Sequence, residues 1–202
     1  AATAKFDTGI PLDEVVMEYI TAELKGVIGK QYAAPQGRIL MNPFADVKAS
    51  SWFGKYVIDL YNDGIINGTS ATTYAPNNTL TWAAALKLLL VSNGDLKAAD
   101  ATGADWSKNA IAKAAELGLV AADLDGAKAI SRLEFCQVAA KLNKLAESKT
   151  ESKFTDCTDG YVMALVDAKV ISGMTETTFE PAASLTRAQI AKILYQLTLI
   201  EK

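Results

Sequence analysis

The feature that most constrains this fold is an internal repeat, because self-similarity at a period of about 50 residues indicates stacked supersecondary units. Four short elements occur in the same order in two parts of the chain. They are Phe44-Ala45-Asp46 and Phe154-Thr155-Asp156, Gly64-Ile65-Ile66-Asn67-Gly68 and Lys169-Val170-Ile171-Ser172-Gly173, Tyr74-Ala75-Pro76 and Phe179-Glu180-Pro181, and Leu80-Thr81 and Leu185-Thr186. The spacing agrees as well, since 13 positions separate Gly68 from Thr81 and Gly173 from Thr186. The chain therefore contains two clear copies of one unit.

A fainter copy lies between these two. Its matching residues are Trp106 for Trp52, Gly118-Leu119-Val120 for Gly64-Ile65-Ile66, and Ile130-Ser131 for Leu80-Thr81. This copy has a shorter loop and lacks the aromatic-x-Pro element. Thr81, Ser131 and Thr186 then lie 50 and 55 residues apart, a period that fits a pair of helices with their loops.

Each copy is predicted to form two helices. In the first, apolar residues follow the i, i+3, i+4, i+8 spacing of an amphipathic helix; they are Val57, Leu60, Tyr61 and Ile65, then Ile111, Ala114, Ala115 and Leu119, then Val162, Leu165, Val166 and Val170. The second begins after Thr81, Ser131 or Thr186. Its expected buried residues are Leu88 and Leu89, then Phe135, Val138, Ala139 and Leu142, then Ile190, Ile193, Leu194 and Leu197. One helix pair cannot bury its apolar face alone, so we expect the three copies to share a core.

The sequence therefore predicts an all-α protein made of three helix-loop-helix repeats and an N-terminal helix. The expected repeats cover residues 44–99, 100–149 and 150–202, and residues 1–43 form the N-terminal segment. That segment is not a fourth copy, but its apolar residues between Leu12 and Ile28 have helical spacing. We expect it to pack on the repeats, because its apolar face would otherwise be exposed.

Composition narrows the function. A net charge of −3 provides no overall positive field to attract nucleic acid, and the apolar run from Leu80 to Val91 is interrupted by Lys87 and too short to span a bilayer. The absence of histidine removes the commonest general base and metal ligand. Cys136 and Cys157 lack the close spacing of zinc or redox motifs, and we favour free thiols over a disulfide. We therefore expect no catalytic activity, metal or cofactor.

The ordered elements Phe-x-Asp, Gly-Ile-Ile-x-Gly, Phe-x-Pro and Thr-Arg-Ala-Glu resemble the S-layer homology repeat over residues 44–199. The third copy is the nearest to this pattern and ends in Leu185-Thr-Arg-Ala-Gln189. The resemblance implies a pseudo-trimeric spindle outside the cell, on the bacterial cell wall or S-layer. It also implies binding of secondary cell-wall polysaccharide, often pyruvylated, in grooves between repeats.

Two departures leave the number of working grooves open. In the first copy the Thr-Arg-Ala-Glu motif reads Thr81-Trp82-Ala83-Ala84, so tryptophan replaces its arginine. The second copy keeps Ser131-Arg132-Leu133-Glu134 but lacks Phe-x-Asp and Phe-x-Pro.

The arginines of this motif are the first candidate site residues. Ser131 and Thr186 are placed as N-caps, and Glu134 and Gln189 would complete capping boxes. Arg132 and Arg187 follow directly, in a first turn where the helix dipole disfavours a cation. We therefore expect a sugar carboxylate there, bound by exposed first-turn amides and the guanidinium. The alternative is an ion pair with a carboxylate of the neighbouring repeat.

Two aromatic and two acidic residues complete the candidate glycan site. Trp52 and Trp106, near the start of a first helix, either stack against a sugar or cap the core, and we favour the core. Asp46 and Asp156 either accept hydrogen bonds from sugar hydroxyls or hold a turn.

A second class of function remains open from the sequence. Helical repeats also serve as protein-binding scaffolds, and other surface-layer subunits are the expected partners in that case. A glycosidase would need two carboxylates about 5 to 10 Å apart in a cleft, and no acidic pair in the sequence is marked out for that role.

Overall fold

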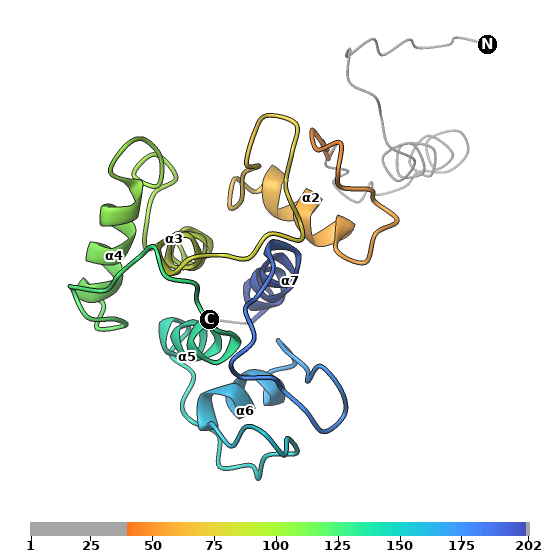
Figure 1. Cartoon of the computed structure of the whole chain (residues 1–202), viewed down its shortest axis with the longest axis vertical. Coiled ribbons are helices and arrows are strands. Elements are labelled where there is room, and N and C mark those ends of the chain that lie inside the picture. The colour runs from red at the N-terminus through yellow and green to blue at the C-terminus, as the bar shows by residue number, and fades with distance from the viewer. Residues whose placement is uncertain (1–39, 201–202) are drawn as a thin grey trace, which may run out of the picture. The chain divides into compact units, whose positions relative to one another are not determined.

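The computed structural model describes residues 40–200, and within them the protein is helical (Figure 1). Its helices are α2 (Gly54–Asn62), α3 (Trp82–Asn93), α4 (Trp106–Glu116), α5 (Arg132–Leu142), α6 (Gly160–Asp167) and α7 (Arg187–Thr198). Residues 40–200 contain three isolated β-bridges and no named strand, so the all-α prediction is confirmed. Within this range, none of the helices combines the length and the apolar character needed to cross a membrane.

The chain divides into two compact units, one ending at Ala75 and one beginning at Pro76. The helix and the apolar face predicted between Leu12 and Ile28 lie outside the described residues. Closure of the repeats into a spindle and the repeat boundaries stay predictions.

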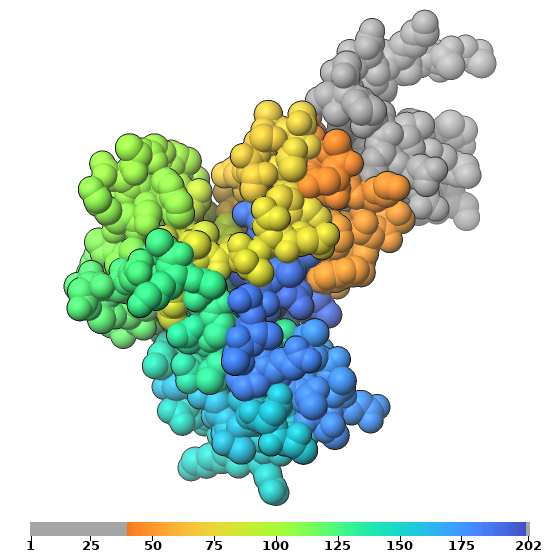
Figure 2. All heavy atoms as spheres, viewed as in Figure 1, coloured from red at the N-terminus to blue at the C-terminus, as the bar shows by residue number. Residues whose placement is uncertain are grey.

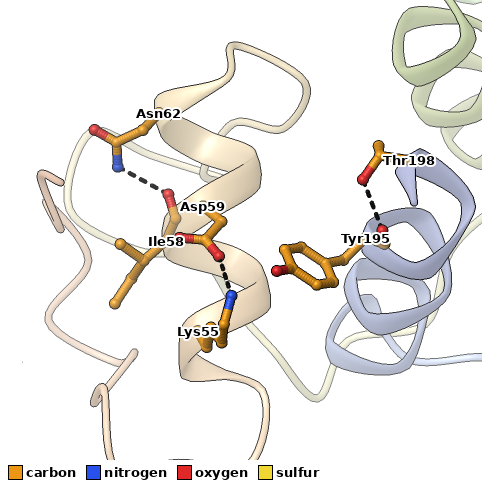
Figure 3. Close-up of polar contacts among 6 residues, drawn as sticks. All are labelled: Lys55, Ile58, Asp59, Asn62, Tyr195 and Thr198. Carbon is orange, nitrogen blue, oxygen red and sulfur yellow. Dashed lines mark hydrogen bonds and ion pairs between the residues drawn. The ribbon is translucent and has the colours of Figure 1, made fainter. Parts of the chain in front are cut away.

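The first unit is built on α2, whose two faces differ as its sequence predicts. Val57 and Leu60 are fully buried on one face. On the other face, Lys55 forms an i, i+4 ion pair with Asp59 at 2.5 Å, and the Asn62 amide donates to the Ile58 carbonyl at 2.8 Å (Figure 3). Exposed pairs of this kind contribute only about 0.3 to 0.5 kcal/mol, so burial of the apolar face holds α2 in place.

In the second unit, the second helices of the three copies lie together at the centre. The helix α3 packs on α4, α5 and α7, and α5 packs on α6 (Figure 1). All the apolar residues predicted to be buried in the second helices are buried: Leu88, Leu89, Phe135, Val138, Ala139, Leu142, Ile190, Ile193, Leu194 and Leu197. Near the end of α7, the Thr198 hydroxyl donates to the Tyr195 carbonyl at 2.7 Å (Figure 3). The shared core predicted from helical periodicity is therefore present among these helices.

The second helices begin where their N-caps predict. Thr81 accepts a hydrogen bond from the Ala84 amide at 3.4 Å, and Ser131 and Thr186 each form a complete capping box with the residue three positions later. An N-cap is worth about 1 kcal/mol because it satisfies an amide that has no partner within the helix.

The first two amides of each second helix bond to the loop of another copy. The partner carbonyls lie in the loop just before the second helix of that other copy, at N to O distances of 2.8 to 3.0 Å. The pairs are Trp82 with Lys128 and Ala83 with Gly126, Arg132 with Ala183 and Leu133 with Pro181, and Arg187 with Asn78 and Ala188 with Pro76. Figure 2 shows the segments before α5 and α7, green and blue, in contact at one of these junctions. Each helix start in the second unit is thus completed by a neighbouring copy.

Candidate functional site

Asp156 holds the turn of the Phe-x-Pro element. Its two carboxylate oxygens accept hydrogen bonds from the amides of Phe179 and Glu180, both at 2.8 Å. Glu180 has φ +60°, a left-handed conformation that costs a non-glycine residue free energy. The same hydrogen bonds lower the pKa of Asp156, because they favour its charged form. The turn role weighed from the sequence is therefore present, and the sugar contact of Asp156 stays a prediction.

Asp46 makes the same arrangement in the first unit. Its oxygens accept from the amides of Tyr74 at 2.8 Å and Ala75 at 2.7 Å, and Ala75 has φ +57°. In each unit the aromatic ring of Phe-x-Asp packs on the ring of the loop, with centroids 5.6 Å apart for Phe44 and Tyr74. The Phe-x-Asp and aromatic-x-Pro elements, far apart in sequence, thus form one structural clamp.

Arg132 lies on the clamp of the third copy. Its Nη2 donates to the Ser172 carbonyl at 2.8 Å, and its guanidinium lies 4.6 Å from the centroid of the Phe179 ring. The side chain is only 7% exposed, and its buried Nε has no hydrogen-bond partner among the described residues. Burial lowers the pKa of Arg132, while Cys136 and Glu180 oppose this effect. Arg132 therefore joins the second copy to the third through a carbonyl and an aromatic ring.

The expectation of exposed first-turn amides is wrong. The Arg132 and Leu133 amides bond to the Ala183 and Pro181 carbonyls, and the Glu134 amide bonds to the Ser131 hydroxyl at 3.3 Å. The first turn of α7 is closed in the same way. A buried amide needs a partner, and the neighbouring loop supplies one before any ligand arrives. An anion at these helix starts can bind through side chains and the dipole, but not through these amides.

Arg187 is the corresponding arginine of the third copy. It is half-buried at the first position of α7, and its charge lowers the pKa of Lys87 on α3, although burial of Lys87 is the larger cause. The Lys87 ammonium lies 5.3 Å from the centroid of the Trp106 ring, which is half-buried at the start of α4. Three helices thus bring two cations and an indole to one place.

The other two tryptophans lie near the starts of the first copy's two helices. Trp52 is 58% exposed, so the interpretation that it caps the core is wrong. It contacts Phe53 edge to face at 5.4 Å and leaves much of its surface open to solvent. Trp82 is half-buried at the first position of α3, and its amide bonds to the Lys128 carbonyl. The helix start of the first copy therefore has no cation at this position.

Sequence reasoning missed Lys87, Ser172 and Phe179 as parts of these arginine environments. Phe179 carried a signal, since it belongs to a recurring motif. Lys87 carried none, because its neighbours Trp106 and Arg187 come from other copies.

Other candidate sites are weaker. A hollow with room for about 20 Å³ lies at the far ends of the central helices, lined by Leu89, Ser92, Asn93, Asn143, Leu197 and Thr198. It has space for about one water molecule and no charged side chain. Within residues 40–200, no group of three or more Cys, Asp or Glu side chains is placed to bind a metal ion.

The profile of the S-layer homology domain matches residues 43–86 and 155–191. Both matched segments contain the aromatic-x-Pro turn and the aspartate that holds it. The chain carries S-layer homology domains. The degenerate second copy lies outside the two matched segments, as its missing motifs predict.

Several relatives match part of this chain. An endoglucanase of Bacillus sp. (strain KSM-635) is 29% identical over 77% of this chain and 18% of the enzyme. Exoglucanase XynX of Acetivibrio thermocellus is 27% identical over 76% of this chain and 16% of the enzyme. The surface-layer 125 kDa protein of Lysinibacillus sphaericus is 38% identical over 38% of this chain and 7% of that protein. The chain thus spans less than a fifth of each relative. S-layer homology domains occur in surface proteins and anchor them to the cell wall.

Proposed function

We propose that this chain is a non-covalent cell-surface anchor that binds an anionic, pyruvylated secondary cell-wall polysaccharide outside the cell. In this proposal the S-layer homology repeats cover residues 44–99, 100–149 and 150–202. The chain acts by binding alone and has no catalytic role. Its similarity to glucanases concerns less than a fifth of each enzyme, which favours an anchoring role for the shared part.

The observation that carries the proposal is the position of Arg132 and Arg187. Each is the first residue of a second helix, at a junction where the loop of another copy covers the helix start. The dipole there is positive, so two arginines add charge where the helix already favours an anion. A cation is unfavourable for the helix start itself, whereas it favours a sugar carboxylate bound there.

The proposed site residues have different roles. Arg187, with Trp106 nearby, is the direct contact to the anionic sugar. Arg132 is 7% exposed, so it acts without touching the sugar and adds positive potential to the groove beside the third copy. Trp52 is the exposed aromatic surface for sugar stacking. Asp46 and Asp156 hold the loop in the conformation that binds the glycan, and the remaining lone pairs of their carboxylates accept hydrogen bonds from sugar hydroxyls.

A scaffold for surface-layer subunits is the competing function. The large apolar side chains that are exposed in residues 40–200 are scattered rather than gathered on one helix; they are Met41, Trp52, Leu117, Met174 and Leu199. Single exposed apolar residues are ordinary on protein surfaces. A protein interface therefore has less support than a glycan site.

Calorimetric titration with a wall-derived oligosaccharide, beside the same sugar without its ketal, tests the proposal. Arg187→Ala should weaken binding by about tenfold to a hundredfold, since a charge-assisted hydrogen bond is worth roughly 1.5 to 3 kcal/mol. Trp82→Ala is the control, because the first copy has tryptophan in place of the arginine. Loss of the Trp82 side chain should leave the salt dependence of binding unchanged. A folded Arg187→Ala variant that binds as well as the parent would remove Arg187 from the site.

A further inference from the structure

The second helices α3, α5 and α7 run in the same direction within the second unit. Isolated β-bridges join the segments just before them, so the three helix starts lie together. The small hollow described above is lined by residues from the last turn or C-cap of all three helices, so their ends lie together as well. In Figure 1 the three helices are seen nearly end on. Helices that run in the same direction add their dipoles, which places three C-termini around one hollow.

The common end of these helices has a negative potential. Each C-terminus is equivalent to about half a negative elementary charge, because its last carbonyls have no partner within the helix. A basic residue in the last turn commonly offsets this charge, but α3 and α7 have none there. The helix α5 has Lys141, whose ammonium lies instead over the Tyr161 ring, 5.1 Å from its centroid. Among the described residues, no side chain that lines the hollow is charged. The three dipoles are therefore not offset at the hollow itself.

Each helix contributes a lining residue whose side chain carries a neutral oxygen. The Ser92 hydroxyl bonds to no described residue. The Asn143 side-chain nitrogen donates to the Ala139 carbonyl at 2.8 Å, which leaves its Oδ1 as an acceptor. The Thr198 hydroxyl donates to the Tyr195 carbonyl at 2.7 Å, so its oxygen has only lone pairs to offer. Amide and hydroxyl oxygens are ligands for hard cations.

Size and charge indicate which cation would fit. The hollow has room for about 20 Å³, enough for one water molecule or one ion of similar size, such as potassium. Calcium sites usually include carboxylates, and magnesium keeps several of its own waters. The lining residues provide neither the carboxylates nor the space. In membrane transporters, helix C-termini coordinate sodium ions with similar neutral groups. The hollow is therefore suited to a monovalent cation.

We propose that this hollow binds one monovalent cation of about the size of potassium, and that Ser92, Asn143 and Thr198 supply side-chain oxygen ligands. The bound ion offsets the three aligned dipoles and joins the three copies at the ends of their second helices. The site lies at the opposite helix ends from Arg132 and Arg187. The inference is therefore independent of the proposed function, and its failure would leave that function intact.

The first test compares melting temperatures of the full chain in potassium chloride and in tetramethylammonium chloride. Equal ionic strength keeps charge screening the same in both salts, and tetramethylammonium is too large for a hollow of this size. The parent should melt about 3 °C or more higher in potassium chloride, because an ion that binds only the folded protein stabilises it. The same melting temperature in both salts would overturn the inference.

Two serine variants separate ion binding from general effects of the salt. Ser92→Ala should melt no lower than the parent in tetramethylammonium chloride, because the Ser92 hydroxyl bonds to no described residue and alanine favours a helix. In potassium chloride the same variant should lose most of the parent's gain. Ser107→Ala is the matched control, since Ser107 is a half-buried helical serine of the same unit that does not line the hollow. This control should keep the full gain. A Ser92→Ala variant that keeps it too would contradict the inference.

Crystals grown with rubidium in place of potassium locate the ion directly. Rubidium scatters anomalously, so we expect an anomalous peak in the hollow of the parent and none in a Ser92→Ala, Thr198→Val double variant. A hollow that contains a water molecule and no rubidium in the parent would show that no monovalent cation binds there.

Discussion

Replacing Arg132 with methionine should destabilise the second unit, because Arg132 joins the second copy to the third. Methionine keeps much of the aliphatic stem but loses the charged hydrogen bond to the Ser172 carbonyl, worth roughly 1.5 to 3 kcal/mol. It also loses the contact with the Phe179 ring, worth about 1 to 2 kcal/mol when desolvated. Against this, the variant no longer buries an Nε that has no hydrogen-bond partner, which relieves a cost of roughly 1 to 3 kcal/mol. The balance is a loss of about 2 kcal/mol.

Urea denaturation measures this loss as a lower midpoint at an unchanged slope. A double-mutant cycle with Phe179→Leu isolates the ring contact, and we expect a coupling free energy of about 1 to 2 kcal/mol. The matched control is the cycle of Lys141→Met with Tyr161→Leu, where the cation is exposed and the coupling should be below about 1 kcal/mol. If Arg132→Met is as stable as the parent and the Phe179 coupling is zero, the guanidinium does not hold the two copies together.

Two further predictions concern titrating groups. Hydrogen bonds lower the pKa of Asp156 below its ordinary 3.8, so the stabilisation that Asp156 provides is present above pH 3.8 and is lost as the pH falls through the lowered pKa. The Asp156→Asn variant should therefore melt lower than the parent at pH 7, and the two melting temperatures should converge in acid. Parallel curves of melting temperature against pH would refute this. Burial raises the pKa of Cys136 to about 12, and both cysteines are buried free thiols. A thiol reagent at pH 8 should therefore react only once the protein is denatured, and no reductant should be needed for that reaction. Rapid reaction of the native protein would contradict the structure.

The sequence predicted those features that depend on neighbours along the chain. The helix starts after Thr81, Ser131 and Thr186 follow from cap chemistry within four residues. The buried faces follow from helical periodicity in the same way. Both kinds of signal survive in the degenerate second copy, which is why α4 and α5 were predicted without a complete motif.

The rest depends on partners far away in the sequence. Exposed amides at the start of α5 were a reasonable expectation for an isolated helix, but the Ala183 and Pro181 carbonyls occupy them. The position of Lys87 beside Arg187 depends on how α3 and α7 pack, about 100 residues apart. Residue type alone favours the core for Trp52, and such a preference cannot say which face of a loop points outward.

The central claim is that this chain anchors itself to the wall through an anionic polymer rather than through peptidoglycan or protein. Cosedimentation with purified sacculi, compared with sacculi stripped of their secondary polymer, tests it most directly. Both preparations are free of surface proteins, so a protein scaffold would bind neither. We predict that the protein pellets with intact sacculi and stays in the supernatant with stripped ones. Equal binding to the two preparations, or binding to neither, would contradict the account.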